Sequence, residues 1–381
     1  MKWKILHIII AVSLMVAGCT DSADEHSDNG KPQQERELRL TMGMSQLQNM
    51  TRAAGDLPTG FSAYTYNEKN PINQIVGFLV PTTSTSINSG KTYTCHFIHE
   101  VENSKHVWKS KTYLSDDQYY FYGYMPNVSA TSVTVTPAAT TGASATITMT
   151  GLNAVMPDDI CVIEGVKQYS GSVLPDMTDA IGLFGGESGY YNTNANKDNF
   201  YVLASHIYSA LEINMKLDAT YANLRTIKLR SISLTPYVKE GETYKVAKKI
   251  NATITITHRG GNELTEAVSV AFTTSETAAS SAPAVLYGVE GKELTTTGEE
   301  FLAYLCPNLS PTIKYVMETH YDVYDKEDNL IRENQSATNN LSLSDLTLEQ
   351  GKKYTITITV APTYLYVLSD PDLDNPTFTL Q

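Results

Sequence analysis

The chain has little cysteine, little tryptophan and few charged residues for its 381 residues. It contains 4 Cys and 2 Trp, and 18% of its residues are charged. Lys and Arg number 28 against 41 Asp and Glu, which gives a net charge of −13. An acidic surface cannot neutralise a phosphate backbone, so we expect no nucleic-acid partner. Apolar residues make up 41% of the chain, which is enough to build sizeable cores.

The few cysteines exclude several small stabilised folds. Beyond Cys19 only Cys95, Cys161 and Cys306 remain, far apart and odd in number. A disulfide framework usually has an even number of closely spaced cysteines, and no CxxC pair is present for a zinc ribbon or a thioredoxin-type site. We interpret each cysteine as a small buried hydrophobic residue. The alternative is a single disulfide between two of them.

Motifs that carry catalysis or metal binding are also missing. The sequence has no GxSxG, HExxH, GxGxxG or P-loop. His96 and His99 are close, but on a strand they point to opposite faces. Asp370, Asp372 and Asp374 begin like a calcium loop, which then lacks the required Gly and Glu. We therefore expect no enzymatic activity, no cofactor and no metal ion.

The chain lacks an apolar run long enough to span a bilayer, but its start is apolar. Lys2 and Lys4 precede the run from Ile5 to Val16, which is shorter than the ~20 residues a spanning helix needs. This pattern predicts a signal peptide over residues 1–18. Val16-Ala17-Gly18-Cys19 resembles a bacterial lipobox, which predicts lipidation of Cys19 and a lipid anchor in the outer membrane. A polar, acidic tether follows.

What the sequence does have is alternation with a period of two. It is rich in Thr and contains 24 Tyr, residue types that favour strands. Leu38, Leu40, Met42 and Met44 alternate with less apolar residues, and similar stretches recur to the C-terminus. Each predicts a strand with one face for a core and one for water, as in antiparallel sheets. Helical patterns are short and few, so we expect an all-β fold of sandwiches.

One polar stretch is the best boundary between domains. Residues 185–199 are rich in Gly, Asn and Tyr and poor in aliphatic residues. We expect residues 19–52 to form a lipidated tether and a first strand, residues 53–195 an N-terminal sandwich, and residues 196–381 a C-terminal sandwich.

Together these features resemble the fimbrillin family, the lipoprotein precursors of type V pili. The resemblance rests on the lipobox, the alternating first strand, Thr51-Arg52-Ala53 and two Thr-rich β-domains. Local matches are the aromatic strand Tyr119–Pro126, the strand Ser205–Ile213 and the stretch Gln350–Ile356. The resemblance implies two tandem Greek-key, transthyretin-like sandwiches.

It also implies a mechanism. A protease would cut between Arg52 and Ala53 and release the strand that carries Leu38, Leu40, Met42 and Met44. A strand of the next pilus subunit would then fill the groove, head to tail. Our candidate donor is the C-terminal segment, with Tyr364, Tyr366 and Leu368 on one face; an ordinary final strand is the alternative. The product would be a surface fimbrium, with a host or bacterial surface ligand as a further partner.

Two other functions remain open at this stage. A surface glycan-binding lipoprotein could stack sugars on Tyr190 and Tyr191, or on the aromatic run Tyr119–Tyr124. A hydrolase on a β-scaffold would need a cluster of carboxylates or a Ser/His pair in a cleft, which the sequence does not reveal.

Overall fold

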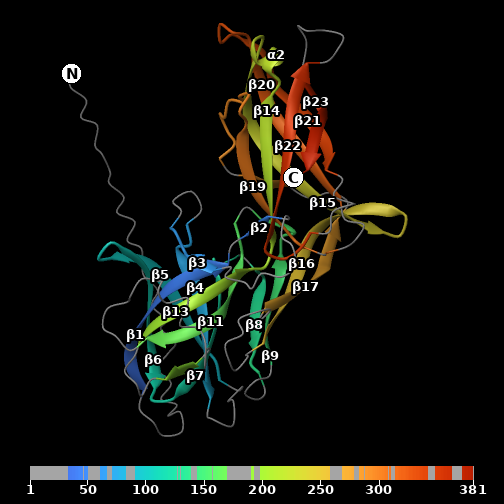
Figure 1. The fold of residues 1–381 in the computed structure, drawn as a ribbon. Coiled ribbons are helices and arrows are strands. Elements are labelled where there is room, and N and C mark those ends of the chain that lie inside the picture. Colours follow the sequence, from blue (N-terminus) through green and yellow to red (C-terminus); the bar gives the residue numbers. More distant parts are fainter. Residues whose placement is uncertain are drawn as a thin grey trace, which may run out of the picture.

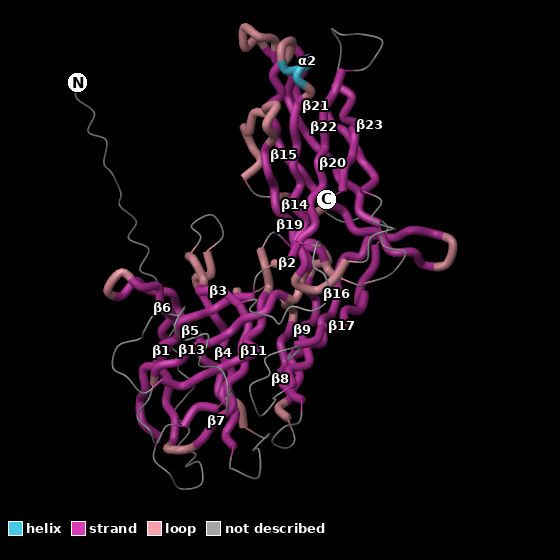
Figure 2. Tube along the Cα trace, in the orientation of Figure 1, coloured by secondary structure: helices cyan, strands magenta, loops and turns pink. Residues whose placement is uncertain are grey.

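The computed structural model describes residues 33–380 except residues 46, 50–60, 67–70, 83–90, 127, 129, 139–143, 157, 170–189, 193–197, 258–267, 279–282, 287, 308, 310–313, 342–347 and 363–370. In this part of the chain almost all regular structure is strand, in three sheets (Figures 1 and 2). The all-β prediction is confirmed. The helix found there, α2 (Ala219–Ala222), is one turn capped by the side chain of Asp218. Within the same residues, no helix has the length and apolar composition to cross a membrane.

The first sheet closes on itself. Its strands are β1 (Gln33–Ser45), β3 (Phe61–Ala63), β4 (Gln74–Thr82), β5 (Tyr93–Glu102), β6 (Lys105–Ser115), β7 (Gln118–Met125), β11 (Cys161–Tyr169), β12 (Tyr190–Asn192) and β13 (Asn199–His206). They pair in the order β11-β13-β1-β6-β5-β4-β7, and β7 pairs back to β11 through Cys161 and Val162. The closed sheet surrounds one apolar core, to which Leu40, Phe97 and Phe121 belong.

The second sheet runs alongside both halves of the molecule. Its strands are β8 (Ser132–Thr136), β9 (Ser144–Leu152), β15 (Thr226–Glu240), β16 (Thr243–Thr257), β17 (Val268–Ala278), β18 (Ala284–Val285), β20 (Lys314–Tyr324) and β21 (Leu330–Leu341). The long strand β16 pairs with β15 at its start and with β9 and β17 further along. Figure 1 shows β16 and β17 reaching from the upper half towards β8 and β9 beside the closed sheet.

The third sheet completes a sandwich. It contains β2 (Gln48–Asn49), β10 (Val155–Met156), β14 (Ser209–Leu217), β19 (Glu299–Leu305), β22 (Lys352–Pro362) and β23 (Pro371–Leu380). The apolar faces of β14, β19 and β22 share a core with residues of β15, β20 and β21. This half is two sheets packed face to face, as the alternation predicts.

Two features of the strands differ from the sequence-based expectations. Strand β1 runs parallel to β13, and β22 runs parallel to both β14 and β2, so the sheets are mixed rather than antiparallel. The aromatic strand β7 is buried on both faces, because Phe121 faces the closed sheet's core while Tyr120 and Tyr122 pack against β9 and β16. Alternation alone cannot reveal that a second sheet covers the outer face.

The expected boundary between residues 195 and 196 does not separate the sheets. It falls between β12 and β13, and both strands belong to the first sheet. In addition, β9 pairs with β16 across that boundary. The polar stretch at residues 185–199 contains β12 and the first residue of β13, both in the first sheet, because a polar composition does not reveal how a segment pairs.

A bulge in β11 places a carboxyl group in a partly buried position. The register between β11 and β13 shifts between Ile163 and Gly165, which leaves Glu164 as the extra residue. Burial raises the pKa of Glu164 to about 7, against a partial opposing effect of its hydrogen bond with Ser205. The folded protein therefore holds this proton more tightly than the unfolded chain does.

This carboxyl makes stability depend on pH. Unfolding between pH 4.5 and about 7 releases a proton, so stability falls as the pH rises through this window. We expect Glu164→Gln to raise the free energy of unfolding by about 2–3 kcal/mol at pH 8 and to change it little at pH 4. Urea denaturation at both pH values checks this. The exposed Glu242→Gln is the control, and a Glu164→Gln effect that is equal at both pH values contradicts the prediction.

Candidate functional site

The first strand, β1, is an internal strand of the closed sheet and lies between β13 and β6. Residues 33–40 pair antiparallel with β6, and residues 39–44 pair parallel with β13. The short strand β3 pairs with residues 43–45. Leu38 and Leu40 are completely buried and Met42 nearly so, while Met44 packs at the margin of the same core. The predicted strand and its apolar face are confirmed.

A buried arginine fixes the beginning of this strand. The Arg36 side chain is 6% exposed, and its guanidinium donates to Asp116 Oδ1 at 2.9 Å and to Asp198 Oδ1 at 3.3 Å. Asp116 follows β6 and Asp198 precedes β13. The ion pairs therefore tie β1 to the two strands that flank it, and leaving the buried guanidinium of Arg36 without these partners would be costly.

The end of β1 meets a cluster of Asp159, Cys161 and His206. The Nε2–H of His206 donates to the carbonyl oxygen of Ser45, the last residue of β1, at 2.6 Å. On the other side of the ring, His206 Nδ1 contacts Asp159 Oδ2 and lies 3.3 Å from Cys161 Sγ. The Cys161 thiol also lies 3.6 Å from Asp159 Oδ2.

The protonation of this cluster follows from its burial. Burial, with a smaller effect of Asp159, raises the pKa of the Cys161 thiol to about 11, so the group is a thiol at neutral pH. Burial by itself lowers the pKa of His206, but Cys161 and Asp159 outweigh it and hold that pKa well above its usual value. His206 is thus an imidazolium paired with the Asp159 carboxylate.

The cluster does not have the arrangement of a cysteine nucleophile and its base. In such a triad the thiol and the carboxylate contact different nitrogens of the histidine. Here both contact Nδ1, while Nε2 is bound to a backbone carbonyl. The thiol is also fully buried. No sequence motif indicates this cluster, because His206 lies 45 positions after Cys161 and no short-range spacing joins them.

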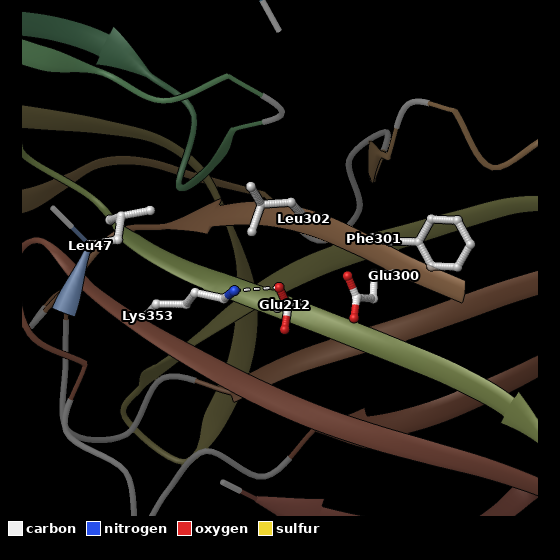
Figure 3. A pocket seen from close by; sticks show the side chains of 6 residues that line it. All are labelled: Leu47, Glu212, Glu300, Phe301, Leu302 and Lys353. Carbon is white, nitrogen blue, oxygen red and sulfur yellow. Dashed lines mark ion pairs between the residues drawn. The ribbon is translucent and has the colours of Figure 1, made fainter. Parts of the chain in front are cut away.

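The segment after β1 reaches the other half of the molecule. Strand β2 pairs parallel with the start of β22 at Lys352 and Lys353. Leu47, just before β2, lines a pocket of about 280 Å³ on the third sheet, with Glu212, Glu300, Phe301, Leu302 and Lys353. Figure 3 shows Leu47 at one end of this pocket and Lys353 ion-paired with Glu212 of β14. One stretch of 17 residues, from Gln33 to Asn49, therefore contacts both the first and the third sheet.

The C-terminal strand also lies along β22. Strand β23 pairs antiparallel with β22, with Ile356 opposite Leu380 and Pro362 opposite Pro371. Both β2 and β23 therefore lie next to β22, β2 at its start and β23 further along. The candidate donor residues Tyr364, Tyr366 and Leu368 lie outside the described residues.

Several other predicted residues also fall outside the described residues. These are Cys19, Arg52 and Ala53. Cys95, Cys161 and Cys306 are buried and form no disulfide with one another, as the interpretation of each as a small buried residue predicts. His96 and His99 point apart: His96 lies 3.1 Å from Gln74 Nε2, and His99 Nε2 lies 2.8 Å from His106 Nδ1.

The aromatic residues proposed as a sugar platform have different positions. Tyr119, Tyr120 and Tyr122 are completely buried and Tyr124 is 5% exposed, so this run cannot stack on a sugar ring. That alternative was wrong for these residues, because β7 is covered on both faces. Tyr190 and Tyr191 of β12 pair through the backbone with Tyr120 and Tyr119 of β7. The side chains of Tyr190 and Tyr191 lie outside the described part of the structure.

The chain is similar to known proteins in its structure, but no match is found by its sequence. No family model matches the chain, and no curated protein matches it either. A proposed cell adhesion protein from Bacteroides fragilis NCTC 9343 matches at a TM-score of 0.42 and 8% identity, covering 90% of this chain and 97% of that one. A second, from Bacteroides uniformis ATCC 8492, has a TM-score of 0.36, 10% identity and coverage of 91% and 97%. A fimbrial protein from Bacteroides vulgatus ATCC 8482 has a TM-score of 0.33, 11% identity and coverage of 81% and 92%. The likeness extends over most of each chain at low identity, and it transfers no residue roles.

Proposed function

We propose that the chain is the precursor of a subunit of a cell-surface filament, and that β1 occupies the place of a strand from a neighbouring subunit. The observation that carries the proposal is the position of β1. It is the N-terminal strand of the described chain, yet it lies between two strands of a closed sheet and supplies three buried side chains to the core. In this proposal the segment up to Arg52 is removed by cleavage before Ala53.

Loss of β1 would create a groove with defined chemistry. Eight positions of β6 and six of β13 would lose their backbone partners. Unpaired strand edges are templates for another strand. The places of Leu38, Leu40 and Met42 would become apolar pockets two residues apart, and the walls fix the direction of the incoming strand as parallel to β13. A segment with apolar residues at every second position, such as Tyr364, Tyr366 and Leu368, meets these requirements.

The same cleavage would open a second place on the molecule. Strand β2 would leave the start of β22, and Leu47 would leave the pocket beside Lys353. Each subunit then offers a groove and, with its C-terminal segment, a strand to donate. Contacts of this head-to-tail kind that do not close into a ring generate a filament. Before cleavage, the lipid on Cys19 would hold the precursor at the outer membrane, exposed at the cell surface.

Cleavage with an Arg-specific protease tests the proposal. Incubation of the purified chain with this protease should release the segment ending at Arg52 and yield filaments. Mass spectrometry detects the cleavage, and electron microscopy detects the filaments. Arg52→Lys keeps the charge but removes the site, so it should stay uncleaved at this position and lower the yield of filaments by at least about tenfold. Clean cleavage that leaves a stable monomer contradicts assembly by strand exchange, and resistance of the wild-type chain at Arg52 contradicts the maturation step.

A further inference from the structure

Two strand ends bring three metal-binding side chains together. Cys161 is the first residue of β11 and His206 the last of β13, and they are direct partners in the antiparallel register. Asp159 lies two residues before β11. One ligand atom from each of the three residues lies within 4.8 Å of the other two. Cys161 is completely buried, His206 is 5% exposed and the Asp159 side chain is 13% exposed.

The distances fit the edges of a metal polyhedron. With bonds of about 2.3 Å to sulfur and about 2.0–2.1 Å to nitrogen or oxygen, neighbouring ligand atoms of a tetrahedral zinc site lie roughly 3.3–3.6 Å apart. Cys161 Sγ lies 3.3 Å from His206 Nδ1 and 3.6 Å from Asp159 Oδ2. Asp159 Oδ2 and His206 Nδ1 are closer than such an edge, so a bound cation has to move the carboxylate away from the ring.

The histidine ring is already oriented as in a metal site. A carbonyl oxygen only accepts hydrogen bonds, so the contact with Ser45 assigns a proton to Nε2. Nδ1 then faces the cluster, where its lone pair can bind a cation in place of the proton shared with Asp159. A metal-binding histidine commonly donates its other N–H to a backbone carbonyl or a carboxylate, which fixes the ring and its tautomer.

An unsatisfied oxygen marks the same place. Asp159 Oδ1 is buried and has no hydrogen-bond partner among the described residues. A buried carboxylate oxygen without a partner is costly, and a cation bound by both oxygens of Asp159 would satisfy it. This oxygen provides a fourth ligand atom next to the other three.

We propose that Asp159, Cys161 and His206 bind one zinc ion. The ligand types select this class of cation, since thiolate and imidazole suit zinc, whereas calcium and magnesium require oxygen ligands. Through the Nε2–H bond to Ser45, the site also contacts the end of β1. The ion therefore joins three neighbouring strands, β11, β13 and β1, at one point.

Zinc binding to the purified chain tests the proposal, with Cys19→Ser in every preparation so that Cys95, Cys161 and Cys306 are the only cysteines present. Metal analysis and calorimetric titration with zinc should find one ion per chain with a Kd of about 1 μM or tighter. Cobalt should give a thiolate-to-metal absorption band. Cys161→Ser should weaken binding by at least about 100-fold and abolish the band.

The other buried cysteines provide matched controls. Cys95→Ser and Cys306→Ser make the same change in buried positions outside the cluster, and both should keep the ion and the cobalt band. Circular dichroism verifies folding, and should Cys161→Ser not fold, Asp159→Asn serves with the same expected loss of affinity. Absence of binding by the wild-type chain, or equal binding by the Cys161 and Cys306 variants, overturns the proposal.

Discussion

Replacing Leu40 with alanine is expected to destabilise the uncleaved chain by about 2–5 kcal/mol and to speed the departure of β1 after cleavage. Leu40 is completely buried and is one of the two residues of β1 that pair with both β6 and β13, opposite Trp108 and Phe200. Alanine leaves a cavity at the centre of the groove. Urea denaturation of the uncleaved chain measures the first effect.

The second effect separates a removable strand from an ordinary one. After cleavage, β1 is held by non-covalent contacts alone. A loss of about 2 kcal/mol or more of its binding free energy then raises its rate of dissociation at least about 30-fold. A fluorophore on the released segment follows this step. Gln34→Ala is the control, because Gln34 is exposed on the same strand and its loss should matter little. A cleaved segment that stays bound in both variants would show that β1 is a permanent part of the fold.

Replacing Gly123 with valine is expected to cost about 3 kcal/mol or more. Gly123 lies on β7 opposite Gly77 of β4. A Cβ at residue 123 would lie 2.7 Å from Ile163 Cδ1 and 2.8 Å from the Val76 carbonyl oxygen. The carbonyl belongs to the neighbouring strand and cannot rotate away, so the closed sheet would have to part.

Three further variants calibrate this prediction. Gly77→Ala should cost less than Gly123→Ala, because the atoms that a Cβ at residue 77 would meet belong to the rings of Phe97 and Phe121. Thr134→Val places the same side chain on an exposed position of β8 and should be nearly neutral. Thermal and urea unfolding measure all four variants. A Gly123→Val protein as stable as wild type would contradict the contact between β4, β7 and β11.

The sequence predicts strands better than it predicts their neighbours. The alternation from Leu38 to Met44 locates β1, and the same period locates β14 and β22, because burial of one face imposes it. Pairing is different, since nothing in β1 specifies a parallel neighbour more than 150 residues later in the chain. The double burial of β7 likewise depends on β9 and β16.

The candidate sites divide in the same way. The apolar face of β1 could be predicted, because it is a local pattern. The cluster of Asp159, Cys161 and His206 could not, because it forms only when the antiparallel pairing of β11 and β13 places Cys161 opposite His206. The pocket at Leu47 also depends on pairing, in this case between β2 and β22.

The strand β16 has a consequence for the order in which the molecule folds. The core behind β4 and β7 contains Ile147 of β9, Ile254 of β16, and also Tyr304 and Cys306 near the end of β19. Because the chain is synthesised from its N-terminus, this core cannot be completed until residue 306 has been made. Contacts so distant in sequence close late and slowly. Until then, the residues of this core that precede residue 304 keep apolar surface exposed. Such exposed surface is prone to aggregation and is the kind of surface that chaperones bind.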